Sequence, residues 1–178
     1  MKFTSLPIPG LILIESPLFT DERGIFLETF QREKFHQAGI DSEFVQDNIS
    51  VSHRGVLRGL HYQRPPHAQG KLVRVLHGAA FDVVVDIRKN SPTYGQHFRI
   101  ELNEENMLML WIPPGFAHGF ATLQDETVFT YKVTGYYNRE SESGIRYNDP
   151  ALKIDWGITD PILSAKDMEL PLFAQHVY

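Results

Sequence analysis

The sequence contains no cysteine, and this absence removes several classes of site at once. Disulfide bonds, thiolate zinc sites and cysteine nucleophiles are all excluded. Long apolar runs are missing too, because no segment approaches the length of a membrane-spanning helix. The first ten residues hold two prolines and no sustained apolar run, so they do not resemble a targeting segment. We therefore expect a cytoplasmic protein that does not bind a membrane.

Excess positive charge is also absent. The chain has 17 lysines and arginines against 22 aspartates and glutamates, which gives a net charge of −5 at pH 7. A nucleic-acid-binding domain would show clustered basic residues without acidic neighbours, so nucleic acid is not an expected partner. An anionic small molecule would have to meet positive charge gathered locally.

Internal repeats, low-complexity tracts and shifts of composition are lacking as well. At 178 residues the chain has the size of one domain and can bury a core without disulfides or structural metals. We expect a single domain over residues 1–178, with arms at the two ends.

Short alternating apolar runs are abundant, and they predict half-buried strands. Glycine, proline, asparagine and serine, which favour turns, separate the candidate strands. These strands are residues 11–15, 24–30, 44–50, 57–63, 71–76, 80–87, 98–102, 107–112 and 128–133. Helices are expected only over 31–38, where Gly39 stops the pattern, and from Ser164 onward. This arrangement is typical of a mainly β sandwich or barrel.

Two polar residues stand out on these predicted strands. Alternation places His61 on the strand face opposite to Arg58, Leu60 and Tyr62. Histidine is suited to removing a proton near neutral pH, although a hydrogen-bonded structural role is the alternative. Lys71 shares a face with the apolar positions of its strand, where its ammonium could stabilise an enolate or a phosphate. A solvated edge lysine is the alternative for Lys71.

Residues 111–120 contain the most distinctive motif, a strand that enters a Pro-Pro-Gly turn and leaves as a second strand bearing His118. The spacing Pro-x-Gly-x-x-His resembles the second cupin motif, which implies a double-stranded β-helix, or jelly roll. The first metal-binding cupin motif needs two histidines and a glutamate, whereas this chain offers His61-Tyr62-Gln63. A metal-dependent cupin oxygenase, with His61, His118 and one carboxylate as ligands, stays open as an alternative.

Two further candidates have plain structural explanations. Ser164 is the expected N-cap of a short helix, with Asp167 at its third position. Tyr131 lies on an amphipathic strand and is as compatible with the core as with a role as an acid.

Motifs along nearly the whole chain together resemble the dTDP-4-dehydrorhamnose 3,5-epimerase family. They are residues 21–24, 44–48, 57–61, 69–74, 81–88, 113–120, 131–137 and 163–167. The resemblance implies a mainly β cupin jelly roll with a few short helices, usually a homodimer, which needs no metal and no cofactor. It also implies an isomerase that inverts C3 and C5 of dTDP-4-dehydro-6-deoxy-D-glucose, giving dTDP-4-dehydro-L-rhamnose for L-rhamnose biosynthesis. Alternatives on the same scaffold are a 3- or 5-epimerase for antibiotic sugars, a 3,4-ketoisomerase and a non-catalytic sugar-binding protein.

The resemblance further implies roles for individual residues. His61 would remove the carbon-bound proton, Asp167 would orient His61, Lys71 would hold the enolate oxygen and Tyr131 would return a proton to the opposite face. Tyr137 would stack on thymine. The implied substrate-binding residues are Arg23, Glu28, Gln46, Asp47, Asn48, Arg58, Lys71, His118, Tyr137, Glu142 and Lys166.

Overall fold

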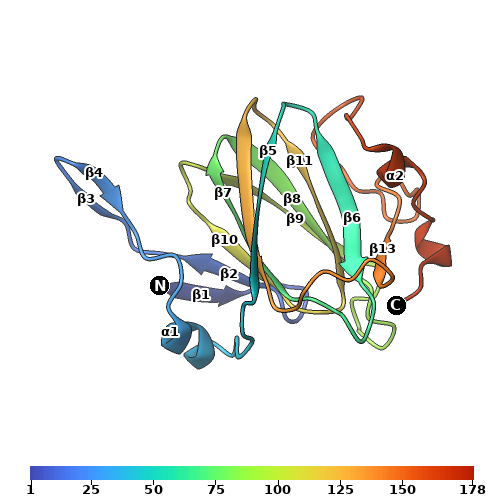
Figure 1. Ribbon diagram of the computed structural model, residues 1–178, viewed down its shortest axis with the longest axis horizontal. Coiled ribbons are helices and arrows are strands. Elements are labelled where there is room, and N and C mark those ends of the chain that lie inside the picture. The colour runs from blue at the N-terminus through green and yellow to red at the C-terminus, as the bar shows by residue number, and fades with distance from the viewer.

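Two antiparallel sheets face each other in the computed structural model, which describes residues 1–178 (Figure 1). The first sheet has the order β1 (Lys2–Ser5), β2 (Ile12–Glu15), β10 (Met109–Ile112), β7 (Lys71–His77), β12 (Thr127–Val133) and β5 (Gln46–Ser52). The second has the order β13 (Glu142–Gly144), β6 (Leu57–Gln63), β11 (Phe116–Thr122), β8 (Ala79–Asp86) and β9 (His97–Asn103). This mainly β, two-sheet jelly roll confirms the fold class predicted from the sequence.

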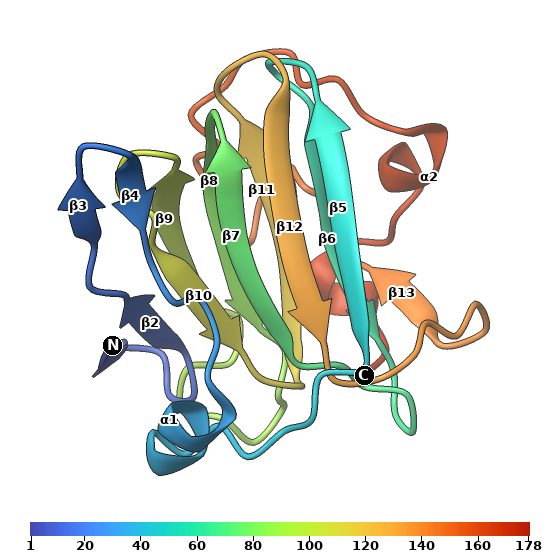
Figure 2. The same ribbon diagram turned by 60° about the vertical axis from the view of Figure 1, so that its left-hand side comes forward.

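The remaining elements lie outside the two sheets. A two-stranded ribbon, β3 (Phe19–Asp21) and β4 (Gly24–Phe26), projects from the body of the molecule (Figure 1). Helix α1 (Arg32–Gln37) packs at the end of the first sheet, and α2 (Ala165–Met168) lies beside β6 (Figure 2). A 3₁₀ turn (Phe173–Gln175) follows near the C-terminus. None of the helices is long and apolar enough to cross a membrane.

The main core lies between the two sheets, because alternation turns one apolar face of each strand inward. Val73 and Val75 of β7 are buried there with Val84 of β8. Phe120 of β11 and Phe129 of β12 stack across the interior with ring centroids 3.9 Å apart. Burying one such aromatic side chain contributes roughly 1.5–3 kcal/mol. The stacked pair also joins the two sheets directly beside the cavity described below.

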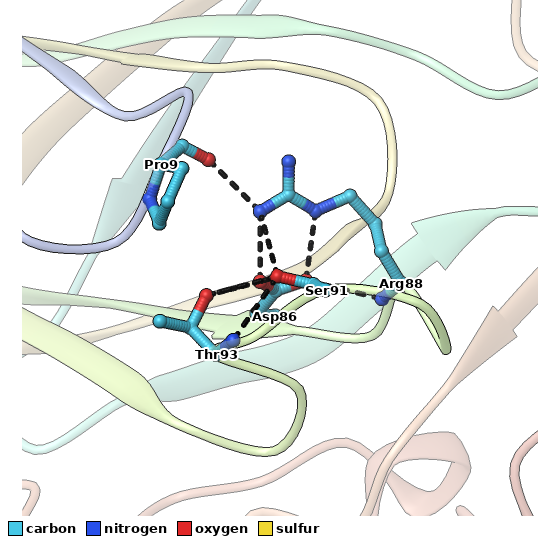
Figure 3. A network of polar contacts seen from close by, with 5 residues as sticks. All are labelled: Pro9, Asp86, Arg88, Ser91 and Thr93. Carbon is cyan, nitrogen blue, oxygen red and sulfur yellow. Dashed lines mark hydrogen bonds and ion pairs between the residues drawn. The ribbon is translucent and has the colours of Figure 1, made fainter.

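A network of polar contacts fixes the loop after β8 (Figure 3). The Asp86 carboxylate accepts hydrogen bonds from Arg88 at 2.7 Å, Ser91 at 2.5 Å and Thr93 at 2.6 Å. Burial alone would raise the pKa of Asp86, but these hydrogen bonds lower it to about 2. Arg88 also donates to the carbonyl oxygen of Pro9 at 2.8 Å, so the network ties the loop to the N-terminal segment.

Both predicted helices form, and each has a side-chain N-cap, of which only Ser164 was predicted. The Gln31 side chain accepts from the backbone N–H of Lys34 at 2.7 Å, and the Ser164 hydroxyl accepts from that of Asp167 at 3.1 Å. These hydrogen bonds satisfy N–H groups that a helix start leaves without a partner.

Strand prediction was accurate for the long alternating runs and also found the short strands β2 and β10, but it failed for other short strands. Strand β6 has the predicted bounds, whereas the strand expected over 24–30 ends at Phe26. Strands β1, β3 and β13 were not predicted. Each has only three or four residues, so pairing with a neighbouring strand rather than local alternation defines it.

The predicted separation of His61 from Arg58 was also wrong, because β6 contains a bulge. Its register against β11 shifts, so that His61 pairs with His118 but Arg58 pairs with Phe120. Three steps along β6 therefore match two steps along β11, which is the signature of one extra residue. Arg58 and His61 consequently line the same cavity.

Candidate active site

A polar cavity opens between β5 and β12 of the first sheet and β6 of the second. It has a larger lobe of about 580 Å³ and a smaller lobe of about 250 Å³. Five residues line both lobes and mark where they join, namely Asn48, His61, Lys71, Tyr131 and Glu142. Three of the four predicted catalytic residues lie at this junction, and the fourth, Asp167, lines the larger lobe.

His61 and Asp167 form a close pair although 106 residues separate them. The His61 Nε2 lies 2.5 Å from the Asp167 Oδ1, and the His61 side chain is 32% exposed while that of Asp167 is 6% exposed. Burial by itself would raise the pKa of Asp167, but hydrogen bonds from His61 and Ser164 hold it below its ordinary value. The ionised carboxylate favours a proton on Nε2, which leaves the Nδ1 of His61 with a lone pair. His61 can therefore act as a base.

Lys71 enters the cavity from the start of β7, so of the two alternatives left open by the sequence the structure matches the inward lysine and not the solvated edge lysine. Burial lowers the pKa of Lys71 to about 8, while Asp82 and Glu142 oppose the shift. Its Nζ makes only one long hydrogen bond, to the carbonyl oxygen of His61 at 3.4 Å. The ammonium is thus free to donate to a ligand oxygen.

Tyr131 reaches the cavity from β12, in the sheet opposite to the one that carries His61. It is half-buried and also packs against the main core. Burial raises the pKa of Tyr131, although the positive charge of Arg58 opposes this effect. The phenol is therefore protonated near neutral pH and can donate a proton.

A second histidine–aspartate pair lies deeper in the same site. The His118 Nε2 donates to the Asp82 Oδ2 at 2.7 Å, and the two side chains are 6% and 0% exposed. Burial lowers the pKa of His118 and outweighs the opposing effect of Asp82, so the imidazole is neutral near pH 7. His118 lines the larger lobe rather than merely packing in the turn.

The metal-site alternative does not match this arrangement of side chains. No group of three or more histidine, aspartate and glutamate residues lies close enough to hold a metal ion. His61 and His118 each bind their own aspartate instead of converging on one point.

Positive charge gathers in the larger lobe, as an anionic ligand would require. Arg58 donates twice to the Ser52 hydroxyl, both at 3.2 Å. Lys166 pairs with Glu142 at 2.5 Å, and the Tyr137 hydroxyl donates to the same carboxylate at 2.6 Å. Glu142 therefore connects α2 to the loop that carries Tyr137.

The other predicted binding residues divide into two groups. Gln46 and Asn48 line the cavity and are hydrogen-bonded to each other at 2.9 Å. The structure does not bring the remaining three there, because they pair elsewhere: Arg23 with Asp21, Glu28 with Lys34 and Asp47 with Lys132.

Sequence reasoning missed Ser52, Asp82, Gln63 and Gln69, which support or line the cavity. Asp82 had a usable signal, since a carboxylate within the apolar run Ala79–Asp86 must find a buried partner. The others are ordinary polar residues near strand ends and turns, and no local pattern distinguishes them.

Comparison with known proteins finds relatives that match nearly the whole chain. The family model for dTDP-4-dehydrorhamnose 3,5-epimerase matches residues 5–175. The dTDP-4-dehydrorhamnose 3,5-epimerase of Shigella flexneri is 48% identical over 179 residues, covering 100% of this chain and 99% of that protein. The crystal structure of the epimerase from Elizabethkingia anophelis has a TM-score of 0.96 at 47% identity, covering 100% and 99% of the two chains. A Legionella pneumophila 3,5-epimerase in complex with dTDP-4-keto-L-rhamnose has a TM-score of 0.94 at 48% identity, covering 98% and 93%.

Proposed function

The chain belongs to the dTDP-4-dehydrorhamnose 3,5-epimerase family, and from this premise we propose how its cavity inverts two carbons of dTDP-4-dehydro-6-deoxy-D-glucose. The protein is an isomerase, and the product is dTDP-4-dehydro-L-rhamnose. One observation supports the mechanism above the others. A histidine–aspartate pair and a protonated tyrosine reach one cavity from opposite sheets, with a lysine ammonium at the same junction.

The first step removes a proton from a carbon beside the ketone. His61 takes this proton on its Nδ1. The electron pair of the broken C–H bond forms a double bond to the carbonyl carbon of the sugar, and the ketone oxygen becomes the enolate oxygen. Such a proton is acidic enough only when the enolate oxygen is stabilised, and the Lys71 ammonium donates to that oxygen. Asp167 holds the ring and stabilises the imidazolium that forms. A positioned base of this kind contributes typically about a hundredfold to ten-thousandfold in rate.

The second step returns a proton to the opposite face of the same carbon. The Tyr131 phenol donates this proton and the enolate collapses to the ketone. The tyrosinate then regains a proton from solvent, and the His61 imidazolium releases its proton to solvent, so both groups are ready for the second carbon. A single base would return the proton to the face from which it came, so inversion requires this second group. Repetition at the carbon on the other side of the ketone completes the reaction.

Substrate binding follows from the distribution of charge. The diphosphate is an anion, and Arg58 and Lys166 provide local positive charge in a chain of net charge −5. Ser52 holds the Arg58 guanidinium in place. We assign His118 to the sugar and Tyr137 to the thymine ring, because the former lies deep in the larger lobe and the latter is exposed at the smaller lobe.

We also propose that the protein is a homodimer in which Arg23 and Glu28 serve the partner's cavity. In one chain neither residue lines the cavity, because Arg23 lies on the projecting β3–β4 ribbon and Glu28 follows it (Figure 1). The ribbon exposes Phe19 at 58%, Ile25 at 53% and Phe26 at 69%. An exposed apolar surface of this kind is typical of a protein interface. A two-fold axis would give each cavity one ribbon.

The substrate and the number of inversions are tested together by nuclear magnetic resonance in deuterated water. The protein should convert dTDP-4-dehydro-6-deoxy-D-glucose into dTDP-4-dehydro-L-rhamnose that carries deuterium at both C3 and C5. Deuterium and inversion at only one carbon would identify a 3- or 5-epimerase instead. If neither carbon exchanges its proton for deuterium, the proposed function is refuted.

A further inference from the structure

The loop 134–141 between β12 and β13 carries two exposed aromatic residues, of which Tyr137 lines the smaller lobe. Tyr136 is 70% exposed and Tyr137 is 54% exposed, and neither belongs to a core cluster. The only side-chain hydrogen bond of Tyr137 is the one to Glu142. An exposed ring stacks well on a ligand only if the backbone beneath it is held in place.

Two glutamine side chains hold the backbone on either side of these tyrosines. The Gln69 Nε2 donates to the carbonyl oxygen of Gly135 at 2.6 Å. The Gln63 Oε1 accepts from the backbone N–H of Asn138 at 3.1 Å. Both glutamines line the smaller lobe, and neither hydrogen-bonds to another side chain.

Backbone contacts secure only the two ends of the loop. Thr134 exchanges hydrogen bonds with Gly70 at 3.1 Å and 2.8 Å, and Arg64 donates to the carbonyl oxygen of Ser141 at 2.8 Å. Between these ends, the backbone groups of Tyr136 and Tyr137 make no hydrogen bond. The Arg64 side chain also donates to the carbonyl oxygen of Glu140 at 2.5 Å, but the backbone next to the two tyrosines is held only by Gln63 and Gln69.

We propose that Gln63 and Gln69 are positioning residues that hold Tyr137 over the smaller lobe, so that its ring stacks on the pyrimidine base of the nucleotide-linked substrate. This role rests on the proposed function, since it requires a nucleotide in the cavity. The glutamines act through Tyr137 and not by contact with the base. Their loss consequently weakens nucleotide binding but leaves the reacting groups His61, Lys71 and Tyr131 in place.

The experiment is a double-mutant cycle on dTDP affinity, measured by titration calorimetry. Its proteins are the wild type, Gln69→Leu, Tyr137→Ala and the double variant, with Gln63→Leu as a second test at the other end of the loop. Removing one neutral hydrogen bond is worth about threefold to tenfold in a binding constant. Gln69→Leu and Gln63→Leu should each weaken dTDP binding by about that factor and raise KM for the keto sugar, with kcat close to wild type.

Coupling between the effects of Gln69→Leu and Tyr137→Ala on dTDP affinity shows whether Gln69 acts through Tyr137. Gln69→Leu should weaken binding no further in the Tyr137→Ala background, because the ring that it positions is already gone. The control is Gln124→Leu, since the Gln124 side chain is exposed and makes no hydrogen bond. This control should bind dTDP like the wild type, and thermal unfolding should show that all variants fold.

Three results would overturn the proposal. Wild-type dTDP affinity in both glutamine variants would exclude a role in positioning. Effects of Gln69→Leu and Tyr137→Ala that multiply would show that Gln69 contacts the ligand itself, and a loss of kcat alone would show an effect on the chemistry. Failure of the proposed function has a different signature, because the wild-type protein would then not bind dTDP at all.

Discussion

At the scale of single residues, exposure separates two otherwise similar histidine–aspartate pairs. His61 is 32% exposed to the cavity while its partner Asp167 is almost fully buried, so the ring can exchange a proton and the carboxylate stays fixed. His118 and Asp82 are both buried, and burial keeps His118 neutral. A neutral, fixed imidazole is suited to hydrogen bonding with a sugar, whereas His61 is suited to proton transfer.

Substitution of the first pair tests this distinction. His61→Ala should lower kcat by about a hundredfold to ten-thousandfold, because it removes the base. Asp167→Asn should lower it less, because Asp167 orients the base and does not replace it. The control is His53→Ala, whose side chain is 85% exposed. Wild-type turnover by a folded His61→Ala protein would refute the assignment.

The pKa of Lys71 predicts a decline of activity at alkaline pH. Its pKa is about 8, and only the protonated ammonium brings positive charge to the enolate oxygen. The value of kcat/KM should therefore fall as the pH rises through about 8. In Lys71→Arg the guanidinium stays charged throughout this pH range. The alkaline decline of kcat/KM should therefore disappear, even if the variant is slower than the wild type at every pH. If kcat/KM of Lys71→Arg still declines at the same pH, a group other than Lys71 causes the decline.

At the scale of elements, alternation predicted what depends on neighbours in the sequence. It gave the bounds of β6, and it placed Lys71 on the same face of β7 as Val73 and Val75, which the structure turns inward. It failed at the bulge in β6, because the extra residue is defined by pairing with β11. The supporting contacts from Ser52 to Arg58 and from Asp82 to His118 were missed for a related reason, since hydrogen bonds between strands leave no local pattern.

The bulge should make Gly59 hard to replace. Its φ is +138°, and a Cβ there would lie 2.5 Å from the Gly119 Cα. Gly55 has a φ of +81° but nothing within 4 Å of such a Cβ, so Gly55→Ala reports the conformational cost alone, about 1–2 kcal/mol. Gly59→Ala should add roughly 1–3 kcal/mol for the clash, measured as the free energy of unfolding in urea. Equal destabilisation by the two substitutions would contradict the close approach of β6 and β11.

At the scale of the whole molecule, the central question is how the projecting ribbon relates to the cavity. The sequence resemblance grouped Arg23 and Glu28 with the binding residues, but within one chain neither residue lines the cavity. A sequence pattern carries no information about which copy of a chain supplies a residue. The resemblance predicted a set of site residues, and one chain brings most of them to the cavity but not Arg23, Glu28 and Asp47.

Mixing two variants, each lacking one of the residues that a complete cavity needs, tests the shared site. Arg23→Ala and His61→Ala proteins, refolded together, should form mixed dimers in which one cavity has both native residues. Random pairing makes half of the dimers mixed, so about a quarter of the cavities should be intact. Light scattering should show a dimer throughout. No gain in turnover over the separate variants would indicate that Arg23 does not serve the partner's cavity.

The most direct test of the account is the Tyr131→Phe variant, followed by nuclear magnetic resonance in deuterated water. The base and the acid of the proposed mechanism lie on opposite faces of the sugar, and this substitution removes only the acid's hydroxyl. The variant should still exchange substrate protons for deuterium, because His61 can remove a proton and return one to the same face, but it should form little inverted product. Phenylalanine is nearly isosteric with tyrosine, so a purely structural Tyr131 would leave both rates close to wild type. Inversion that keeps pace with exchange in this variant would contradict the two-faced site.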